Sequence, residues 1–360
     1  MIHVFIGTKA QYIKTAPLLR LMDERDVAYR LIDSGQHARM ARGFREELGL
    51  REPDYALGGA GDVASIRRAL LWSLSLARRL WSGAALRRDV FGGEGGVCVV
   101  HGDTPSTLLS ALMARRAGLG VAHLEAGLRS HRLLHPFPEE IIRIITMRLS
   151  SHLFAPDEAA VSNLRAMGVN GRVVALSGNT SLEAVRWALS SGQVEAGSGP
   201  VIVTMHRVEN LHNSGRIEGL VELIEEISRS NPVRFVIHEP TMAALQKKRF
   251  DERLRAGGVE LHQLSGHQDF VRMLASAPFV VTDGGSIQEE CALLGVPTML
   301  WRMGSERPDG LEANVVVTGY DDAVVQRFLD DPESHRKPIA EPDVNPSEEI
   351  LSELIQIVEN

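Results

Sequence analysis

Short apolar runs recur along the first half of the chain, and polar or glycine-containing turns and helix-like stretches follow them. A short continuous apolar run is typical of a strand that is buried on both faces of a parallel sheet. Six strands that mostly alternate with helices predict a doubly wound parallel α/β sheet. The predicted strands are 1–6, 29–32, 97–100, 119–123, 152–155 and 173–176.

A second series of this pattern follows the Gly/Ser-rich segment 191–199, which we interpret as a linker. A chain of 360 residues is long for one hydrophobic core and suits two domains. We predict Rossmann-like domains over 1–180 and 181–340, and a C-terminal helix in 341–360 that crosses back to the first domain. The strands predicted in the second series are 201–204, 235–237, 279–282 and 297–300.

Composition and charge fit an ordinary globular protein, with 44% apolar and 24% charged residues. The net charge of −7 provides no basic surface that would favour nucleic acid or an anionic membrane. Cys98 and Cys291 lie in apolar runs, which predicts buried thiols in a reducing compartment. No window approaches the length of a membrane span, so we expect a soluble cytoplasmic protein.

Carboxylate, imidazole and guanidinium side chains gather between 123 and 143, where a predicted strand ends and a predicted helix begins. Glu125 follows the strand, Arg129 and His131 lie in the loop, and Glu139 opens the helix. Ligands of open parallel α/β sheets bind in this zone, outside the carboxyl ends of the strands. The alternative is a surface loop with solvated charges and a helix N-cap.

Four titratable residues, Asp103, Glu125, Glu139 and His206, come from separate segments of this kind, and we expect them to share a site. Carboxylates that share a partly buried site repel one another, which allows one to act as an acid and another as a base at the same pH. Taken alone, each carboxylate is more simply explained as a helix cap or an ion-pair partner. The set as a whole favours catalysis.

Other residues could hold a diphosphate. Lys9, Lys14 and Arg307 supply positive charge, and the turn Gly284-Gly285-Ser286 opens a predicted helix whose first amides can bind an anion. Glu290, one helical turn further on, could accept hydrogen bonds from ribose hydroxyls. Its alternative role is that of an acid favoured by the helix dipole.

Several short motifs occur in order over nearly the whole chain. They are Gly7-Thr8-Lys9, Ile13-Lys14, Gly35-Gln36-His37, His101-Gly102-Asp103-Thr104, His123-Leu124-Glu125-Ala126-Gly127-Leu128-Arg129-Ser130, Pro136-Phe137-Pro138-Glu139-Glu140, Ser177-Gly178-Asn179-Thr180, His206-Arg207, Gln288-Glu289-Glu290 and Glu306-Arg307-Pro308. With these motifs the sequence resembles the UDP-N-acetylglucosamine 2-epimerase family. The resemblance implies a GT-B-like fold, in which two Rossmann-like domains face each other across a cleft and the second binds the nucleotide.

The resemblance also implies roles for individual residues. The implied catalytic residues are Asp103, Glu125, Glu139 and His206. The implied substrate contacts are Lys9, Lys14, Arg143, His238, Phe270, Gly284, Gly285, Ser286, Glu290 and Arg307. The family eliminates UDP from the sugar with loss of the C2 proton and re-adds it in the opposite configuration, without a cofactor or metal. It further implies a homodimer and a role in polysaccharide biosynthesis.

The sequence departs from the family pattern at several positions. Lys9 stands where the family has arginine, Gln11 where it has glutamate, and Glu239 where it has arginine. A lysine lacks the bidentate fork of arginine, so the phosphate geometry differs. The turn after Asp283 carries its hydroxyl on Ser286, two residues later than usual. The segment 38–39 lacks the second glutamine of a bacterial allosteric site, which predicts weak or absent activation by substrate.

Three hypotheses for the function remain. The first is a non-hydrolysing UDP-N-acetylglucosamine 2-epimerase, which interconverts UDP-GlcNAc and UDP-ManNAc. The second, an alternative reaction, is that of a hydrolysing epimerase or a GT-B glycosyltransferase that acts on a related sugar nucleotide, since one fold serves many chemistries. The third is a sugar-nucleotide-binding protein without activity, and the intact acids and histidine argue against it. The sequence leaves open which carboxylate is the base.

Overall fold

A computed structural model describes residues 1–35, 38–58, 80–132, 138–190, 192, 194–263, 266–305, 307–339 and 344–359, and for 38–42 it describes the helix only. The chain divides into two compact units, Met1–Ala184 with Asp343–Asn360, and Val185–Pro342. The predicted domain boundaries and the predicted cleft stay predictions. Gln36, His37, Pro136, Phe137 and Glu306 of the motifs lie outside the described residues, as do the side chains at 38–39 on which the prediction about allostery rests.

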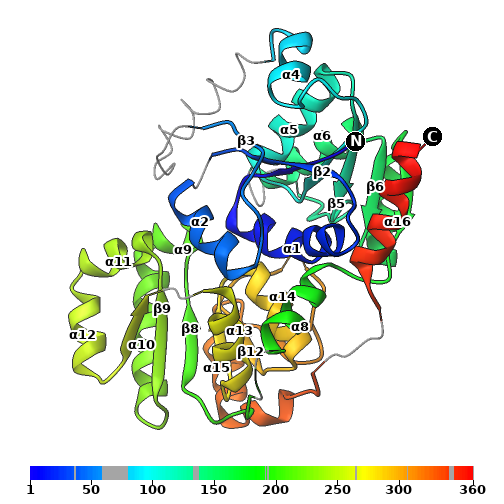
Figure 1. The fold of residues 1–360 in the computed structure, drawn as a ribbon. Helices are drawn as coiled ribbons and strands as arrows, with labels where there is room; N and C mark the ends of the chain where they lie inside the picture. The colour runs from blue at the N-terminus through cyan, green and yellow to red at the C-terminus, as the bar shows by residue number, and fades with distance from the viewer. Residues whose placement is uncertain are drawn as a thin grey trace. The chain divides into compact units, whose positions relative to one another are not determined.

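The first unit is built on a seven-stranded parallel sheet with the order β3-β2-β1-β4-β5-β6-β7 (Figure 1). The order reverses between β1 and β4, so the carboxyl ends of these two strands form the topological switch point, where such sheets bind ligands. The strands are β1 (Ile2–Ile6), β2 (Tyr29–Asp33), β3 (Tyr55–Ala56), β4 (Val97–His101), β5 (Gly120–Leu124), β6 (His152–Ala155) and β7 (Arg172–Ala175).

The C-terminal helix belongs to the first unit and packs beside its first helix, where Arg25 pairs with Glu348. The helices of this unit are α1 (Lys9–Glu24), α2 (Ala38–Glu47), α4 (Gly83–Asp89), α5 (Pro105–Arg116), α6 (Glu139–Leu149), α7 (Glu158–Met167) and α16 (Pro346–Glu359). The helix α8 (Ser181–Leu189) spans the boundary between the two units.

The second unit repeats this architecture with a six-stranded parallel sheet in the order β10-β9-β8-β11-β12-β13, and its switch point lies between β8 and β11. The strands are β8 (Val201–Thr204), β9 (Val233–Ile237), β10 (Glu260–Gln263), β11 (Val280–Thr282), β12 (Thr298–Leu300) and β13 (Val315–Val317). The helices are α9 (Val208–Leu211), α10 (Ser214–Ser228), α11 (Glu239–Gln246), α12 (Phe250–Ala256), α13 (His267–Ser276), α14 (Gly285–Leu294), α15 (Asp322–Asp330) and the 3₁₀ helix η1 (Pro332–His335).

Successive residues of the central strands point into different hydrophobic clusters. Val203 and Phe235 belong to one cluster, while Ile202 and Val236, their neighbours in sequence, belong to another. Both faces of the second sheet are therefore covered, which explains why its central strands read as continuous apolar runs. The predicted fold class, α/β with two doubly wound parallel sheets, is confirmed. Within the described part of the chain, no helix has the length and apolarity needed to cross a bilayer.

Candidate active site

The turns after β1 and β4 lie against each other at the first switch point. A Cβ atom at Gly7 would lie 2.2 Å from Oγ of Ser106, so this approach requires glycine. Thr8 caps α1 and Thr104 caps α5, each through its side chain. The first amides of both helices are therefore fixed at the edge of the sheet where a ligand is expected.

Gln11 ties these two turns together. Its Oε1 accepts hydrogen bonds from the backbone N–H groups of Gly7 (2.7 Å) and Thr8 (3.1 Å), and its Nε2 donates to the carbonyl of His101 (2.6 Å). A carboxylate could not donate the last of these bonds. The departure from the family pattern at this position thus has a structural role, because Gln11 fixes the turn that carries Asp103.

Glu125, directly after β5, has a left-handed backbone with φ of +61°, which costs a non-glycine residue on the order of 1 kcal/mol. Its Oε1 accepts hydrogen bonds from Nζ of Lys14 (2.6 Å) and Nδ2 of Asn179 (2.9 Å), and its Oε2 lies 4.0 Å from Nδ1 of His101. The side chains of Lys14 and Glu125 are both only 8% exposed. Lys14, a predicted phosphate contact, is therefore in a buried ion pair with a predicted catalytic carboxylate.

A chain of alternating charges links Asp103 to the loop after β5. Oδ2 of Asp103 lies 2.5 Å from Nη2 of Arg143, and Nη1 of Arg143 lies 3.7 Å from Oε2 of Glu140. Glu140 is completely buried and also accepts hydrogen bonds from Nε of Arg129 (2.5 Å) and the amide of Ser130 (3.0 Å). Burial alone would raise the pKa of Glu140, but Arg129, the Ser130 amide and Arg143 hold it below its usual value.

Glu139 and Lys9 are each the first residue of a helix. Glu139 is half-buried and begins α6 four residues before Arg143, so both lie on the face of the helix that reaches Asp103. Nζ of Lys9 lies 4.3 Å from the centre of the Phe44 ring, a cation–π contact. The structure thus brings Asp103, Glu125 and the Glu139 end of α6 to one edge of the first sheet.

His123 supports this edge from within the sheet. Its Nε2 lies 2.8 Å from the carbonyl oxygen of Gly102, the residue before Asp103. Burial lowers the pKa of His123 to about 4, so the ring is neutral at neutral pH and donates to this carbonyl. The motif that contains His123 was visible in the sequence, but its contact with Gly102 depends on the pairing of β4 with β5.

His206 and Gly284 meet at the switch point of the second sheet, after β8 and β11. A Cβ atom at Gly284 would lie 2.6 Å from Cε1 of His206, so a larger residue there would displace the His206 ring. Gly284 is the N-cap of α14, and the amides of Gly285 and Ser286 open that helix. The His238 ring, at the end of β9, has its centre 5.7 Å from that of His206. A helix terminus, a structure that can bind anions, and two imidazoles therefore share this edge.

Arg307 is held from two sides by the Gln288-Glu289-Glu290 motif. Its Nη1 donates to Oε2 of Glu289 at 3.0 Å, and its carbonyl oxygen accepts a bond from Nε2 of Gln288 at 3.1 Å. Ser305 donates to Oε1 of Gln288 at 2.6 Å, which secures the same loop. The sequence singled out Arg307 but gave no role to Gln288 and Glu289, which position its backbone and guanidinium.

Glu290 and Phe270 are connected through α13. Nδ1 of His267 lies 3.8 Å from Oε1 of Glu290, and His267 is one helical turn before the buried Phe270. Of the predicted nucleotide contacts in the second unit, Phe270 and Glu290 therefore come from adjacent helices, α13 and α14, while His238 follows β9 and Arg307 follows β12. Whether they share one ligand with Asp103 and Glu125 of the first unit stays a prediction.

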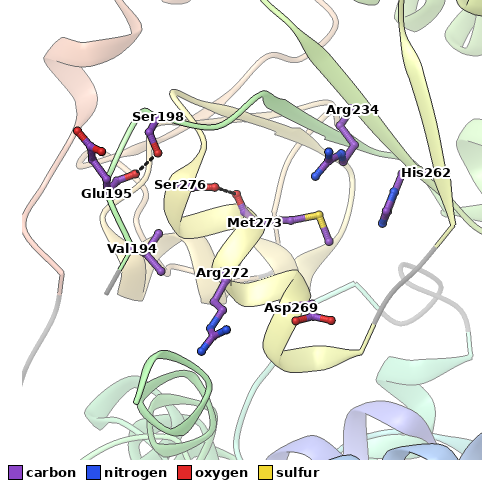
Figure 2. A pocket seen from close by; sticks show the side chains of 9 residues that line it. All are labelled: Val194, Glu195, Ser198, Arg234, His262, Asp269, Arg272, Met273 and Ser276. Atoms are coloured by element: carbon purple, nitrogen blue, oxygen red, sulfur yellow. Dashed lines mark hydrogen bonds between the residues drawn. The ribbon is translucent and has the colours of Figure 1, made fainter. Parts of the chain in front are cut away.

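A pocket of about 530 Å³ opens beside α13 in the second unit (Figure 2). Its lining includes the segment 194–198, which precedes β8, and Arg234, the second residue of β9, so it lies toward the amino ends of the strands. Two arginines, Arg234 and Arg272, and two carboxylates, Glu195 and Asp269, line the pocket, and Nε of Arg234 also donates to Glu260 at 2.9 Å. This balance of charge does not favour a diphosphate, and His206 follows the opposite ends of the strands.

Two doubly wound sheets with charged residues at both switch points define an α/β protein of the GT-B-like class. A family model described as UDP-N-acetylglucosamine 2-epimerase matches residues 20–343. The chain belongs to this family, as its motifs predict. The predicted GT-B-like fold is also confirmed by solved structures of the family that match nearly the whole chain.

Individual relatives show how similar this chain is to enzymes whose names state a substrate. UDP-N-acetylglucosamine 2-epimerase of Methanocaldococcus jannaschii is 31% identical over 335 residues, 88% of each chain. UDP-2,3-diacetamido-2,3-dideoxy-D-glucuronate 2-epimerase of Pseudomonas aeruginosa is 29% identical over 339 residues, 90% of each chain. The crystal structure of the Methanocaldococcus jannaschii enzyme in complex with UDP-GlcNAc and UDP matches with a TM-score of 0.83 and 27% identity over 99% of each chain.

A UDP-glucosyltransferase from Polygonum tinctorium also matches, with a TM-score of 0.57 over 99% of this chain and 98% of its own. At 14% identity this likeness concerns the fold alone. The fold therefore does not separate an epimerase from a glycosyltransferase, and the assignment of a reaction depends on the side chains at the site.

Proposed function

We propose that this protein is a UDP-N-acetylglucosamine 2-epimerase, which interconverts UDP-GlcNAc and UDP-ManNAc by elimination and re-addition of UDP. The observation that carries the proposal is the partly buried cluster at the first switch point, where Asp103 and Glu125 each contact a cation within 2.6 Å. Titratable residues that cluster at the carboxyl ends of the strands of a parallel sheet, where ligands bind, are typical of catalytic sites. In a chain of this family, such a cluster supports acid–base chemistry on a sugar nucleotide.

The reaction must break the C2–H bond of a sugar carbon that has no adjacent carbonyl group. Such a proton is poorly acidic, so its loss requires the simultaneous departure of UDP from C1. The electron pair of the C2–H bond then forms a C1–C2 double bond, and the C1–O pair leaves with the diphosphate. Return of UDP to C1 and of a proton to the other face of C2 gives the epimer.

Two proton-transfer groups are needed on opposite faces of the ring, and we assign them from Asp103, Glu125 and Glu139. Lys14 and Arg143 keep Glu125 and Asp103 in fixed positions, which favours proton transfer at a defined atom. Glu139 is the third candidate, because it lies on the face of α6 that carries Arg143. The choice of base among the three stays open.

We propose that Arg307 and the amides of Gly285 and Ser286 bind the departing diphosphate. A guanidinium and the amino end of a helix both stabilise the negative charge that develops on a leaving phosphate. We propose that His206, beside the amino end of this helix, acts in catalysis. His238, Phe270 and Glu290 are proposed to contact the nucleotide. Lys9 and Lys14 are assigned to the substrate in the first unit.

A time course of UDP-GlcNAc with the purified protein, followed by NMR, tests the proposal. A new UDP-sugar with the C2 configuration of UDP-ManNAc is the expected result. Release of free UDP with free sugar would instead assign a hydrolysing epimerase, and transfer to an added acceptor would assign a glycosyltransferase. A spectrum that does not change, with UDP-GlcNAc bound, would overturn the proposal in favour of a binding protein.

The sugar itself is open to one specific alternative. The Pseudomonas aeruginosa relative acts, by its name, on a diacetamido-glucuronate, and its identity to this chain is within two percentage points of that of the Methanocaldococcus jannaschii enzyme. A parallel time course with UDP-2,3-diacetamido-2,3-dideoxy-glucuronate separates the two substrates. Faster turnover of the uronate would replace UDP-GlcNAc in the proposal and leave the mechanism unchanged.

We further propose that the enzyme is cytoplasmic, as its composition indicates, and that it acts as a homodimer in polysaccharide biosynthesis, as the family resemblance implies. Light scattering on the purified protein measures the molar mass directly, and the mass of a single chain is 39.5 kDa. A mass near twice this value is expected, and a mass near the single value would contradict the dimer.

A further inference from the structure

Asp283 follows β11, and its carboxylate binds the backbone of the turn after β8, which carries His206. Asp283 is completely buried. Its Oδ1 accepts a hydrogen bond from the amide of His206 (3.0 Å), and its Oδ2 accepts bonds from the amide of Arg207 (3.0 Å) and from Nδ2 of Asn210 (2.9 Å). Arg207 returns a bond from its Nε to the carbonyl of Asp283 (3.0 Å). The carboxylate is therefore fixed by three donors before the His206 ring is considered.

The His206 ring is confined between Asp283 and Gly284. Its Nδ1 lies 3.4 Å from Oδ1 of Asp283. The approach of Cε1 to Gly284 leaves no room even for a methyl group. The side chain is nevertheless 40% exposed, so the ring extends from a buried carboxylate to the accessible edge of the sheet where ligands are expected.

We propose that Asp283 is a positioning residue that holds the proton of the neutral His206 ring on Nδ1 and leaves Nε2 unprotonated for the substrate. The proposal deepens the function proposed above, on which it rests for the catalytic role of His206. A carboxylate is an acceptor only, so an unprotonated Nδ1 beside Oδ1 would place two lone pairs against each other. A proton on Nδ1 removes this repulsion, and the same logic governs histidines oriented by a carboxylate in other enzymes.

The other charged groups around the ring do not reverse this preference. Partial burial lowers the pKa of His206, Asp283 and Glu209 raise it, and Arg207 and Arg302 lower it. The lowered pKa makes the neutral ring the relevant form at neutral pH. Of these groups, Asp283 is the carboxylate whose oxygen faces Nδ1. With Nδ1 protonated, Nε2 accepts a hydrogen bond or a proton from the substrate and cannot donate one.

The wild-type protein itself gives the first test. The full chain is labelled with ¹⁵N in its histidine rings, and its imidazole resonances are recorded at a pH where His206 is neutral. The His206 resonances are identified by their loss in His206→Gln. A pyrrole-like shift at Nδ1 and a pyridine-like shift at Nε2 are expected. The opposite assignment, or equal averaging of the two nitrogens, would overturn the proposal.

Asp283→Asn provides the second test, with Asn210→Ala as its control. The amide of asparagine can place a donor against Nδ1, so the proton should move to Nε2, and kcat should fall on the order of 10²-fold with a smaller change in KM. Asn210→Ala removes a partner of the same carboxylate but keeps its contact with His206, so the tautomer should not change. An unchanged tautomer in Asp283→Asn would reduce Asp283 to a structural residue and contradict the proposal.

The two proposals fail separately. If the wild-type ring carries its proton on Nδ1 but no sugar nucleotide is turned over, the assignment of the tautomer to Asp283 stands and the proposed function falls. If the epimerisation is observed with the proton on Nε2, the function stands and the positioning role falls. Should Asp283→Asn not fold, the spectrum of the wild-type protein still decides.

Discussion

At the scale of single residues, the candidate site is defined by side chains whose partners lie far away in sequence. Gln11 contacts His101 across 90 positions, and Asp283 contacts the His206 amide across 77. The sequence showed His101 and His206 within motifs and named Gln11 and Asp283 only beside departures from the family pattern, but a motif does not say which residue elsewhere in the chain it meets. Spacing therefore predicted that Asp103, Glu125 and His206 follow strands, whereas the residues that fix them became visible only in the fold.

Glu125→Gln is expected to lower turnover of UDP-GlcNAc by at least ~10²-fold, because an amide cannot exchange a proton with C2. UDP binding should remain nearly intact, since the replacement keeps the size of the side chain. Rates measured by NMR and UDP affinities measured by calorimetry separate the two effects. Glu158→Gln, at an exposed position in α7, is the matched control. Equal rates for Glu125→Gln and this control would remove Glu125 from the mechanism.

At the scale of elements, continuous apolar runs were sufficient to predict the central strands, but three strands at sheet edges were missing. These are β3, β10 and β13. The strand β10 reads Glu-Leu-His-Gln, because an edge strand does not need apolar residues on both faces. The strand β3 has two residues and is too short to give a periodic pattern, whereas β13 is a run of three valines that our prediction did not assign.

Glu140 of α6 accepts hydrogen bonds from Arg129 and Ser130, which lie in the loop after β5. Replacing Glu140 therefore tests how much this connection between the loop and the helix stabilises the fold. Glu140→Gln removes the buried carboxylate that Arg129 and Arg143 share, while Arg143 retains its contact with Asp103, so we expect a loss of about 3 kcal/mol in the free energy of unfolding. Because the pKa of Glu140 is held low, its stabilisation is complete above its ordinary value of 4.5 and is lost as the pH falls below that value. The difference between wild type and variant should therefore shrink in acid.

Denaturant titrations at neutral and acidic pH measure this difference. The neighbouring Glu139→Gln is the matched control, since Glu139 is half-buried and proposed to act in catalysis. It should affect turnover much more than stability, the reverse of what is expected for Glu140→Gln. A stability loss that is the same at every pH would show that the charge of Glu140 is not its source.

At the scale of the whole molecule, two buried histidines make stability depend on pH. Burial lowers the pKa of His3 and of His123 to about 4, from an ordinary value of 6.5. The unfolded chain therefore binds more protons between these values, and the free energy of unfolding should fall as the pH drops from 6.5 to 4, on the order of 3 kcal/mol for each ring. His3→Gln should remove about half of this slope, while His131→Gln, at an exposed position, should not change it. A pH-independent stability over this range would contradict both assignments.

The fold of the whole molecule does not determine its reaction, because a glucosyltransferase shares it at 14% identity. What separates the candidate reactions is the fate of one hydrogen atom. A transferase or a simple hydrolase cleaves the bond at C1 and leaves the C2 hydrogen in place. An epimerase that works by elimination must break the C2–H bond, and the carboxylate that takes this proton then exchanges it with solvent.

We therefore expect that UDP-GlcNAc incubated with the enzyme in heavy water gives a product with deuterium at C2. Deuterium should also enter C2 of the recovered substrate, because the re-addition of UDP runs in both directions. The NMR signal of the C2 proton is lost on exchange, so its intensity measures both events. Glu125→Gln should slow exchange and epimerisation together if Glu125 is the base, because the same proton transfer starts both. If an epimerised product kept its original C2 hydrogen, the elimination mechanism would be excluded, since no group in that mechanism can return the same hydrogen to the opposite face.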